Sequence, residues 1–278
     1  MKGIAHTLAR AMGIGFLVAS GPRAGAQLPY FQDTFAGTND VGWTHYDPFA
    51  SSGAPGSFTV TNGEYRLQAS ASPDPTALGP GHAASLAGPT MSRGQGVELF
   101  VSVNLTGWDS SQNQTFGCLA LVRNLGSATS QGYAFGYSTS GSIGIFRLQN
   151  DSLSPLVSAP IALDPTHAYL LEVTLYPDGL VGQVFRAEDP GNEIAGVVAL
   201  DTNPGSGVGG LFVWANTGAG LPDATFDNFR TFQAIPEPSA VMLMLTGGGL
   251  AWALRARWRR RSPPAKLSST ESDKQPTT

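Results

Sequence analysis

The stretch 27–234 consists of short apolar runs separated by Gly, Pro, Asn and Asp, and no part of it keeps a helical period. Residues 97–105 carry Val or Leu at every second position, which is typical of a strand with one buried face. Many such runs without helices between them predict an all-β fold. The predicted strands are 58–61, 64–68, 97–105, 116–123, 132–138, 142–149, 169–176, 180–186, 194–200, 209–214 and 225–232.

Turn residues join several of these strands into hairpins. Asn62-Gly63 is a two-residue hairpin signal, because both turn positions need a positive φ. Thr139-Ser140-Gly141 and Pro177-Asp178-Gly179 have similar turn chemistry. The pattern therefore predicts one domain of two antiparallel sheets packed face to face, with a polar loop at 106–115 and a solvated turn at Asp189-Pro190-Gly191.

Charge narrows the possible partners of this domain. The whole chain has a net charge of −4, but 27–234 holds six Arg and no Lys against seventeen Asp and Glu, a net of −11. Such an acidic domain is a poor candidate for binding nucleic acid or an anionic membrane surface, both of which need clustered cations. The single cysteine, Cys118, lies in an apolar run, so we expect a buried, inert thiol.

The N-terminal segment has the three parts of a secretory signal peptide. Lys2 and Arg10 supply a basic start, residues 11–20 an apolar core, and Ala24-Gly25-Ala26 a small-residue cleavage site. We therefore expect residues 1–26 to be removed after export, which leaves a chain that starts at Gln27. The alternative is an uncleaved N-terminal anchor.

The C-terminal region combines a proline motif, an uncharged stretch and a cluster of arginines. Pro236-Glu237-Pro238 precedes residues 240–254, which carry no charge and would form a helix of about 22 Å. A hydrocarbon core is about 30 Å thick, so the predicted transmembrane helix is short. The positive-inside rule would hold the arginines on the cytoplasmic side and the domain outside. These arginines are Arg255, Arg257, Arg259, Arg260 and Arg261.

This order of motifs resembles the PEP-CTERM sorting signal of Gram-negative bacteria over residues 235–261. The resemblance implies recognition by an exosortase, membrane anchoring before cleavage near Pro236-Glu237-Pro238, and delivery to the cell surface or extracellular matrix of exopolysaccharide-producing cells. The polar tail 262–278 departs from the pattern, in which the chain usually stops soon after the arginines. The alternative is an ordinary C-terminal anchor with a chance Pro-Glu-Pro.

Short motifs across 27–234 resemble the concanavalin A-like, laminin-G-like jelly rolls of secreted bacterial proteins. They include Phe31-Gln32-Asp33-Thr34-Phe35 near the start, Gly132-Tyr133-Ala134-Phe135 in the middle and Thr225-Phe226-Asp227-Asn228-Phe229 at the end. The resemblance implies a two-sheet jelly-roll sandwich. That fold hosts lectins, glycosidases and adhesive modules, so it indicates architecture more than function.

Catalytic motifs are missing from the same stretch. The Glu-x-Asp-x-x-Glu strand of jelly-roll glucanases is absent, and no Gly-x-Ser-x-Gly elbow joins a strand to a helix. His45, His82 and His167 are far apart and lack the spacing of zinc ligands. We therefore expect a protein that is not an enzyme.

Two sets of residues are candidates for binding. Asp33 near the first strand and Asp227 with Asn228 in the last could hold a structural Ca²⁺ if these strands are neighbours, or could simply hydrogen-bond strand ends. Trp108 in the polar loop and Trp214 at a strand end could stack on sugar rings, although a tryptophan in a sandwich is more often core. Tyr46 and Tyr137 are lesser candidates, and Trp43 is expected in the core.

These observations lead to one functional prediction and two alternatives. The prediction is an exported surface or matrix protein with a non-catalytic domain that binds polysaccharide and requires no cofactor. The first alternative is a divergent glycoside hydrolase or lyase. The second is a purely structural surface protein without a specific ligand.

Overall fold

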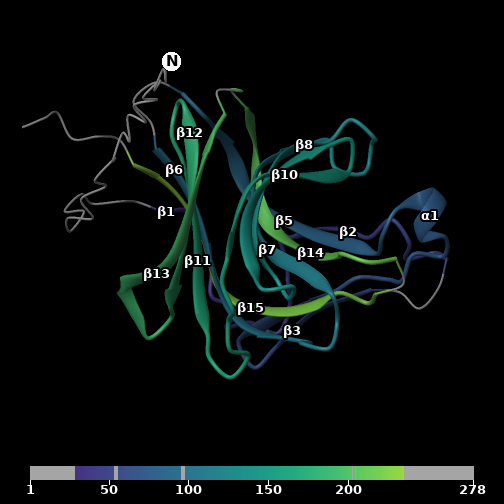
Figure 1. Cartoon of the computed structure of the whole chain (residues 1–278). Helices are drawn as coiled ribbons and strands as arrows, with labels where there is room; N and C mark the ends of the chain where they lie inside the picture. The colour runs from purple at the N-terminus through teal and green to yellow at the C-terminus, as the bar shows by residue number, and fades with distance from the viewer. Residues whose placement is uncertain are drawn as a thin grey trace, which may run out of the picture.

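The protein folds as two antiparallel β-sheets packed face to face (Figure 1). The computed structural model describes residues 29–52, 56–94, 98–201, 203, 205–218 and 220–234. This confirms the predicted all-β, two-sheet sandwich. The predicted signal peptide, sorting signal, transmembrane helix and polar tail lie outside the described residues.

No helix in the part of the chain that the structure describes has the length and apolar character needed to span a membrane.

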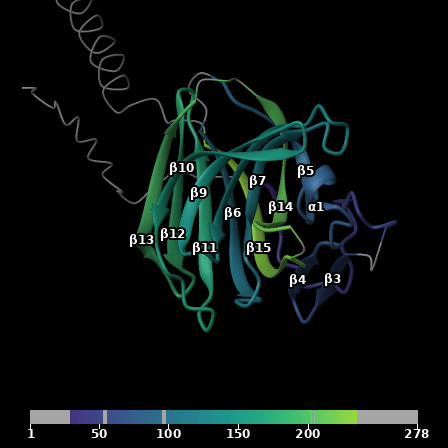
Figure 2. The same cartoon turned by 45° about the vertical axis from the view of Figure 1, so that its right-hand side comes forward.

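The first sheet has eight strands in the order β13-β12-β11-β6-β15-β4-β3, and β1 also pairs with β15. Figure 2 shows β15 between β6 and β4 in this layer. The strands are β1 (Pro29–Asp33), β3 (Ser57–Thr61), β4 (Glu64–Gln68), β6 (Glu98–Trp108), β11 (Tyr169–Leu175), β12 (Gly179–Arg186), β13 (Asp189–Leu200) and β15 (Asp223–Ala234).

The second sheet has seven strands in the order β10-β9-β8-β7-β14-β5-β2. A single turn of helix, α1 (Pro75–Leu78), precedes β5 and is capped by the Asp74 carboxylate. The strands are β2 (Thr44–Tyr46), β5 (His82–Ser92), β7 (Gln114–Arg123), β8 (Gln131–Ser138), β9 (Ser142–Gln149), β10 (Ser152–Pro160) and β14 (Ser206–Ala215).

All three predicted hairpins are confirmed. β3 and β4 pair through Asn62 and Gly63, whose φ angles of 56° and 83° are those of a two-residue hairpin turn. β8 pairs with β9, and β11 with β12, in the expected antiparallel registers. Turn chemistry in the sequence therefore predicted the local strand pairs correctly.

The structure adds strands that the pattern did not predict. β5 is rich in Ala and Ser and lacks an apolar alternation, yet it pairs with β14 on one side and β2 on the other. β10 contains Pro155 and Pro160 and lies at the edge of its sheet, where a missing backbone donor is tolerated. The turn predicted at Asp189-Pro190-Gly191 is wrong, since these residues are the exposed start of β13.

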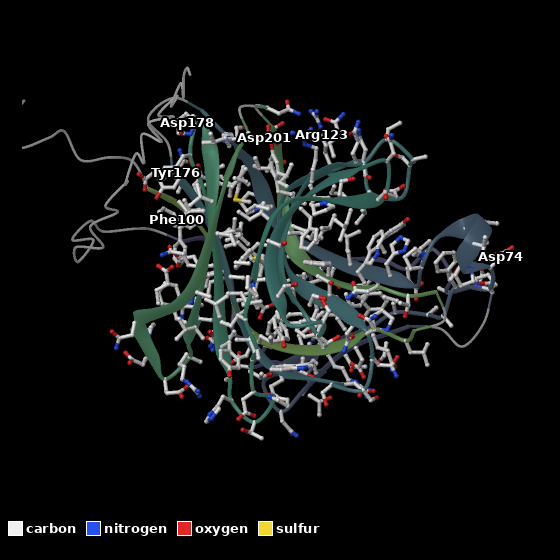
Figure 3. The ribbon with its side chains drawn as sticks, in the orientation of Figure 1. Asp74, Phe100, Arg123, Tyr176, Asp178 and Asp201 are labelled. Carbon is white, nitrogen blue, oxygen red and sulfur yellow. The ribbon has the colours of Figure 1, made fainter. Side chains whose placement is uncertain are left out.

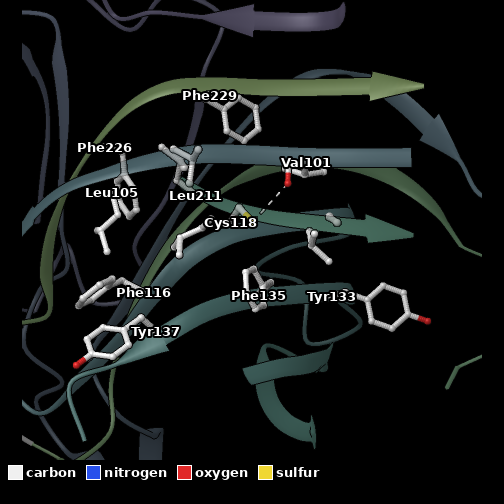
Figure 4. Packing of buried hydrophobic residues seen from close by; sticks show 14 of the residues in the cluster. Val101, Leu105, Phe116, Cys118, Tyr133, Phe135, Tyr137, Leu211, Phe226 and Phe229 are labelled. Carbon is white, nitrogen blue, oxygen red and sulfur yellow. Dashed lines mark hydrogen bonds between the residues drawn. The ribbon is translucent and has the colours of Figure 1, made fainter. Parts of the chain in front are cut away.

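The main core lies between the two sheets and contains the largest side chains. Phe116, Phe135 and Phe226 are fully buried there (Figure 4). Cys118 is also fully buried, with its Sγ 4.0 Å from the Val101 carbonyl oxygen, and burial raises the pKa of its thiol to about 12. This confirms the predicted buried thiol and explains why it would be unreactive, because the thiolate is the nucleophilic form.

Candidate functional site

The outer face of the seven-stranded sheet carries a second apolar cluster. Side chains alternate between faces along a strand, so Leu211 and Val213 of β14 enter the main core while Phe212 and Trp214 lie on the opposite side. The buried members of this outer cluster are Ala84, Leu119, Val122, Ala134, Leu148 and Phe212, with Leu86, Leu125, Phe146, Leu153 and Trp214 packed against them.

The outer face is concave. Tyr46 of β2 and Leu153 of β10 stand at opposite edges of the sheet, yet both line one pocket with Phe212 and Trp214. Figure 1 shows β10 and β2 turned toward the same side of the molecule. The enclosed part of the pocket has a volume of about 20 Å³, room for one or two waters. A larger ligand would therefore lie across its mouth.

A row of glycines flattens this face. Gly117, Gly136 and Gly144 are aligned across β7, β8 and β9. A Cβ on Gly136 would lie 3.0 Å from Cζ of Phe212, and one on Gly144 would lie 3.0 Å from Cζ of Phe146. The aromatic rings thus lie over backbone where a side chain would collide with them, which gives a broad apolar surface.

Trp214 and His82 form a stacked pair on the concave face. Their ring centroids are 4.2 Å apart with an interplanar angle of 25°. His82 is only 8% exposed, and its Nδ1 lies 2.8 Å from the Pro80 carbonyl oxygen. If Nδ1 carries the proton and donates it to that carbonyl, Nε2 is an acceptor. Nε2 is buried and has no hydrogen-bond partner among the described residues, so it is an unpaired acceptor beside the Trp214 ring.

Two carboxylates beside Tyr46 hold loops in place. Asp151 accepts hydrogen bonds from the backbone N–H groups of Gly126 (3.0 Å) and Ala128 (2.8 Å), which fixes the β7–β8 loop. Asp47 accepts from the backbone N–H of Ser70 at 3.1 Å and from its hydroxyl at 2.7 Å. Burial and these two carboxylates raise the pKa of Tyr46 to about 12, so its hydroxyl keeps its proton at neutral pH. Both carboxylates are therefore engaged in structural hydrogen bonds.

The prediction that Trp108 lies in an exposed loop is wrong. Trp108 is the last residue of β6, because β6 continues its pairing with β15 beyond the predicted strand end. Its half-buried ring packs at the margin of the main core, with centroids 5.7 Å from Phe116 and 5.8 Å from Tyr137. Tyr137 is buried in that core as well. Of the two tryptophans predicted to contact sugar, only Trp214 lies on the concave face.

The proposed calcium ligands lie on paired strands, as the sequence suggested. Asp33 accepts from the backbone N–H of Phe35 and from Nε1 of Trp43, both at 2.8 Å. Asp227 accepts from the backbone N–H and Nδ2 of Asn228, each at 2.6 Å. No three His, Cys, Asp or Glu side chains gather at one point within the described ranges. The contacts match the strand-end alternative, and calcium binding stays a prediction.

The sequence did not mark His82 as part of a site, because β5 carries no strand pattern that would have placed it beside Trp214. Tyr46 was only a lesser candidate. Trp43 is buried as predicted and stacks on Tyr65 at 5.4 Å in the main core.

The burial of His82 should make stability depend on pH. Burial lowers the pKa of His82, so below the ordinary histidine value of about 6.5 the unfolded chain takes up a proton that the folded protein resists. The free energy of unfolding should therefore fall as pH decreases from about 7 to about 5, and His82→Gln should reduce this slope. Urea unfolding at several pH values measures it. His167→Gln, at a partly exposed histidine, is the control, and equal slopes in both variants would contradict the prediction.

The chain matches no protein-family model and no curated protein. Among solved structures it is similar to a prokaryotic β-1,3-1,4-glucanase (lichenase) from a mouse hindgut metagenome, at 12% identity and a TM-score of 0.50, over 74% of this chain and 99% of that one. Two further similar structures are the carbohydrate-binding module CBM66 from Bacillus subtilis (15% identity, TM-score 0.49, 70% and 97% covered) and the basic winged bean lectin (10%, 0.49, 74% and 98%).

The likeness to the glucanase, together with the sheet order, shows a concanavalin A-like jelly-roll fold. This confirms the fold that the second resemblance implied. At 12% identity the likeness shows the fold alone.

Proposed function

We propose that residues 29–234 form a non-catalytic module that binds neutral polysaccharide on the concave face of the seven-stranded sheet. We also propose that the end segments deliver it: a signal peptide for export, and a PEP-CTERM signal that an exosortase recognises before the domain reaches the cell surface or matrix. Neither part of the proposal involves a metal or another cofactor.

The observation that carries the binding proposal is the pairing of Trp214 with His82 on an apolar, concave surface. Sugar rings have apolar C–H faces that stack on aromatic rings and hydroxyls around their edges that donate hydrogen bonds. Trp214 is half-buried and backed by the His82 ring at 4.2 Å, so its orientation is fixed before a ligand arrives. His82 Nε2 supplies an acceptor next to that stacking surface.

The carboxylates around the pocket support a binding role over hydrolysis. A retaining glycosidase needs two carboxyl groups about 5 Å apart and free to act. Asp151, the carboxylate that lines this pocket, already accepts two backbone hydrogen bonds. Asp47 accepts four, two from the backbone N–H groups of its own loop and two from Ser70. Releasing either one would loosen the loop that it holds.

Removing the Trp214 ring should abolish most of the binding. We expect Trp214→Ala to weaken binding of a neutral polysaccharide, such as a mixed-linkage β-glucan, at least about tenfold, since an aromatic contact contributes about 1 kcal/mol beyond buried area. Affinity electrophoresis of the full chain against a panel of neutral polysaccharides measures this. Tyr30→Ala is the matched control, because Tyr30 is an exposed aromatic residue on the other sheet.

The same panel separates the alternatives. Release of reducing or unsaturated sugar ends by the full chain would favour a hydrolase or lyase. Retention on no polysaccharide would favour a purely structural surface protein. Equal binding by Trp214→Ala and wild type would show that a polysaccharide binds elsewhere than on the concave face.

A further inference from the structure

A separate cavity opens at one end of the sandwich, where β7, β8 and β9 meet Asn203 and Gly205. Its volume is about 170 Å³, far larger than the enclosed part of the pocket beside Trp214. Polar side chains form much of its wall, including Arg123, Arg147, Gln131 and Gln149. Gln131 and Gln149 are cross-strand partners in the β8–β9 register. The cavity is therefore lined by hydrogen-bonding groups from adjacent strands.

Half of the six arginines of 27–234 gather at this end of an otherwise acidic domain. Arg123 and Arg147 line the cavity. Arg93 is 7% exposed and lies behind the wall, where its Nη1 donates to the Asn203 carbonyl oxygen at 3.3 Å. Asn203 itself lines the cavity, and its carbonyl also accepts from the Tyr133 hydroxyl at 3.3 Å. The cavity is thus the place where the positive charge of the domain is concentrated.

Carboxylates neutralise this charge only in part. Asp201 pairs with Arg147 at 2.5 Å, and Figure 3 shows Asp201 at the same end of the sandwich as Arg123. Burial alone would raise the pKa of Asp201, but Arg147 and the Asn203 N–H outweigh it, so the pKa is lowered and the carboxylate is charged at neutral pH. Asp178 lies in the neighbouring turn. Within the described ranges, Asp201 is the one carboxylate within 4.0 Å of any of these three guanidinium groups.

Of the two arginines in the cavity wall, one donates to a neutral amide and the other has a donor without an acceptor within the described part of the chain. Arg123 is exposed, and its guanidinium donates to Oε1 of Gln131, a neutral amide. Nε of Arg147 is buried and has no hydrogen-bond partner among the residues that the structure describes. An unpaired buried donor on a charged group costs about 1–3 kcal/mol or more, so an incoming acceptor that reaches it would be favoured.

We propose that this cavity binds a carboxylate group, of the kind carried by a sugar acid, independently of the concave face. A guanidinium presents two parallel N–H donors that match the two oxygens of a carboxylate, which makes Arg123 the natural first contact. The Gln131 and Gln149 amides and the Tyr133 hydroxyl are placed to bind hydroxyls of an attached sugar ring. A cavity of about 170 Å³ suits one such unit at a chain end or branch.

The test uses sodium glucuronate as the probe and the full chain as the protein. We expect isothermal titration to show glucuronate binding with a Kd of about 1 mM and no heat from glucose at this cavity. Arg123→Gln should weaken glucuronate binding about tenfold, because it removes the guanidinium that would bind the ligand carboxylate. The Arg147–Asp201 ion pair stays intact in this variant. Arg186→Gln is the charge-matched control, since Arg186 is a partly exposed arginine on β12 that is absent from the cavity wall.

Further titrations separate this site from the concave face and identify the ligand class. Glucuronate binding that survives Trp214→Ala supports the cavity, whereas binding lost with Trp214→Ala and unchanged in Arg123→Gln overturns it. Acetate that competes with glucuronate shows that the carboxylate is the recognised group and supports the proposal. Inorganic phosphate that binds more tightly than any carboxylate, or the absence of glucuronate binding, overturns it.

Discussion

The Phe135→Ala variant should lose about 3–5 kcal/mol of unfolding free energy, the range measured for large aromatic residues removed from a packed core. Phe135 is fully buried at the centre of β8, opposite Cys118 of β7 (Figure 4). Its ring reaches across to the other sheet, where it packs on the backbone of Gly182 in β12. Removing the ring would leave a cavity between the two sheets. Hydrogen bonds between strands hold each sheet in shape, so the sheets could not collapse to fill the cavity.

Urea unfolding at neutral pH measures this loss. Phe146→Ala is the matched control, because Phe146 is a half-buried phenylalanine on the adjacent strand that points to the concave face instead of the core. Its loss should cost about 1 kcal/mol. A cost for Phe146→Ala equal to that of Phe135→Ala would contradict the view that the intersheet core dominates stability.

The contact with Gly182 adds a sharper test. A Cβ at Gly182 would lie 2.4 Å from the Phe135 ring, a separation that side chains do not tolerate. Gly182→Ala should therefore destabilise the wild-type protein by about 1–3 kcal/mol through overpacking. The same change in the Phe135→Ala background should cost little, so the two substitutions should be strongly non-additive.

Arg93→Met should be the second most damaging change, with an expected loss of about 3 kcal/mol. The guanidinium of Arg93 is buried and donates to the carbonyl oxygens of Tyr176, Gly179 (2.9 Å) and Asn203 (3.3 Å). Tyr176 lies in the β11–β12 turn and Gly179 is the first residue of β12, both in one sheet, and Arg93 directly follows β5 of the other sheet. Methionine keeps the length of the side chain and removes every donor, which leaves those carbonyls to be satisfied by water.

The midpoint of urea unfolding reports this change, and Arg186→Met, at a partly exposed arginine, should alter the unfolding free energy by less than about 0.5 kcal/mol. Arg93→Lys should recover only part of the loss, because an ammonium group cannot span three acceptors as a planar fork does. Equal effects of Arg93→Met and Arg186→Met would show that the three carbonyl contacts contribute nothing.

Local signals in the sequence predicted the hairpins. The elements that were not predicted form through pairing between strands that are far apart in the chain. Asn62-Gly63 fixes its turn through its own φ angles, so two adjacent strands followed from a dipeptide. β5 has no such signal and exists because β14 and β2 bond to both of its sides. The end of β6 was misplaced for the same reason, since β15, far away in the chain, extends it to Trp108.

The candidate sites were less predictable than the fold. Trp214 was identified as a possible sugar contact, but its neighbour His82 comes from a strand without a pattern, and Tyr46 and Leu153 meet there only because the sheet is curved. The arginine-lined cavity joins Arg93, Arg123 and Arg147 with Asn203, residues that share no motif or spacing. Composition showed an acidic domain, and only the folded arrangement shows where its cations gather.

The place of β15 in its sheet also determines how the domain would bear mechanical load. β15 is the last strand before residue 235, and it lies inside the sheet, bonded to β6 from Ala224 to Ala234 and to β4 and β1 on its other side. Interstrand hydrogen bonds run perpendicular to the strands, so tension along β15 would stretch many of them at once. β1 has five residues and, among the described strands, pairs with β15 only, so tension along β1 would be carried by far fewer hydrogen bonds. A domain held by its C-terminal end and pulled through a ligand would therefore resist rupture far better than one held by its N-terminal end.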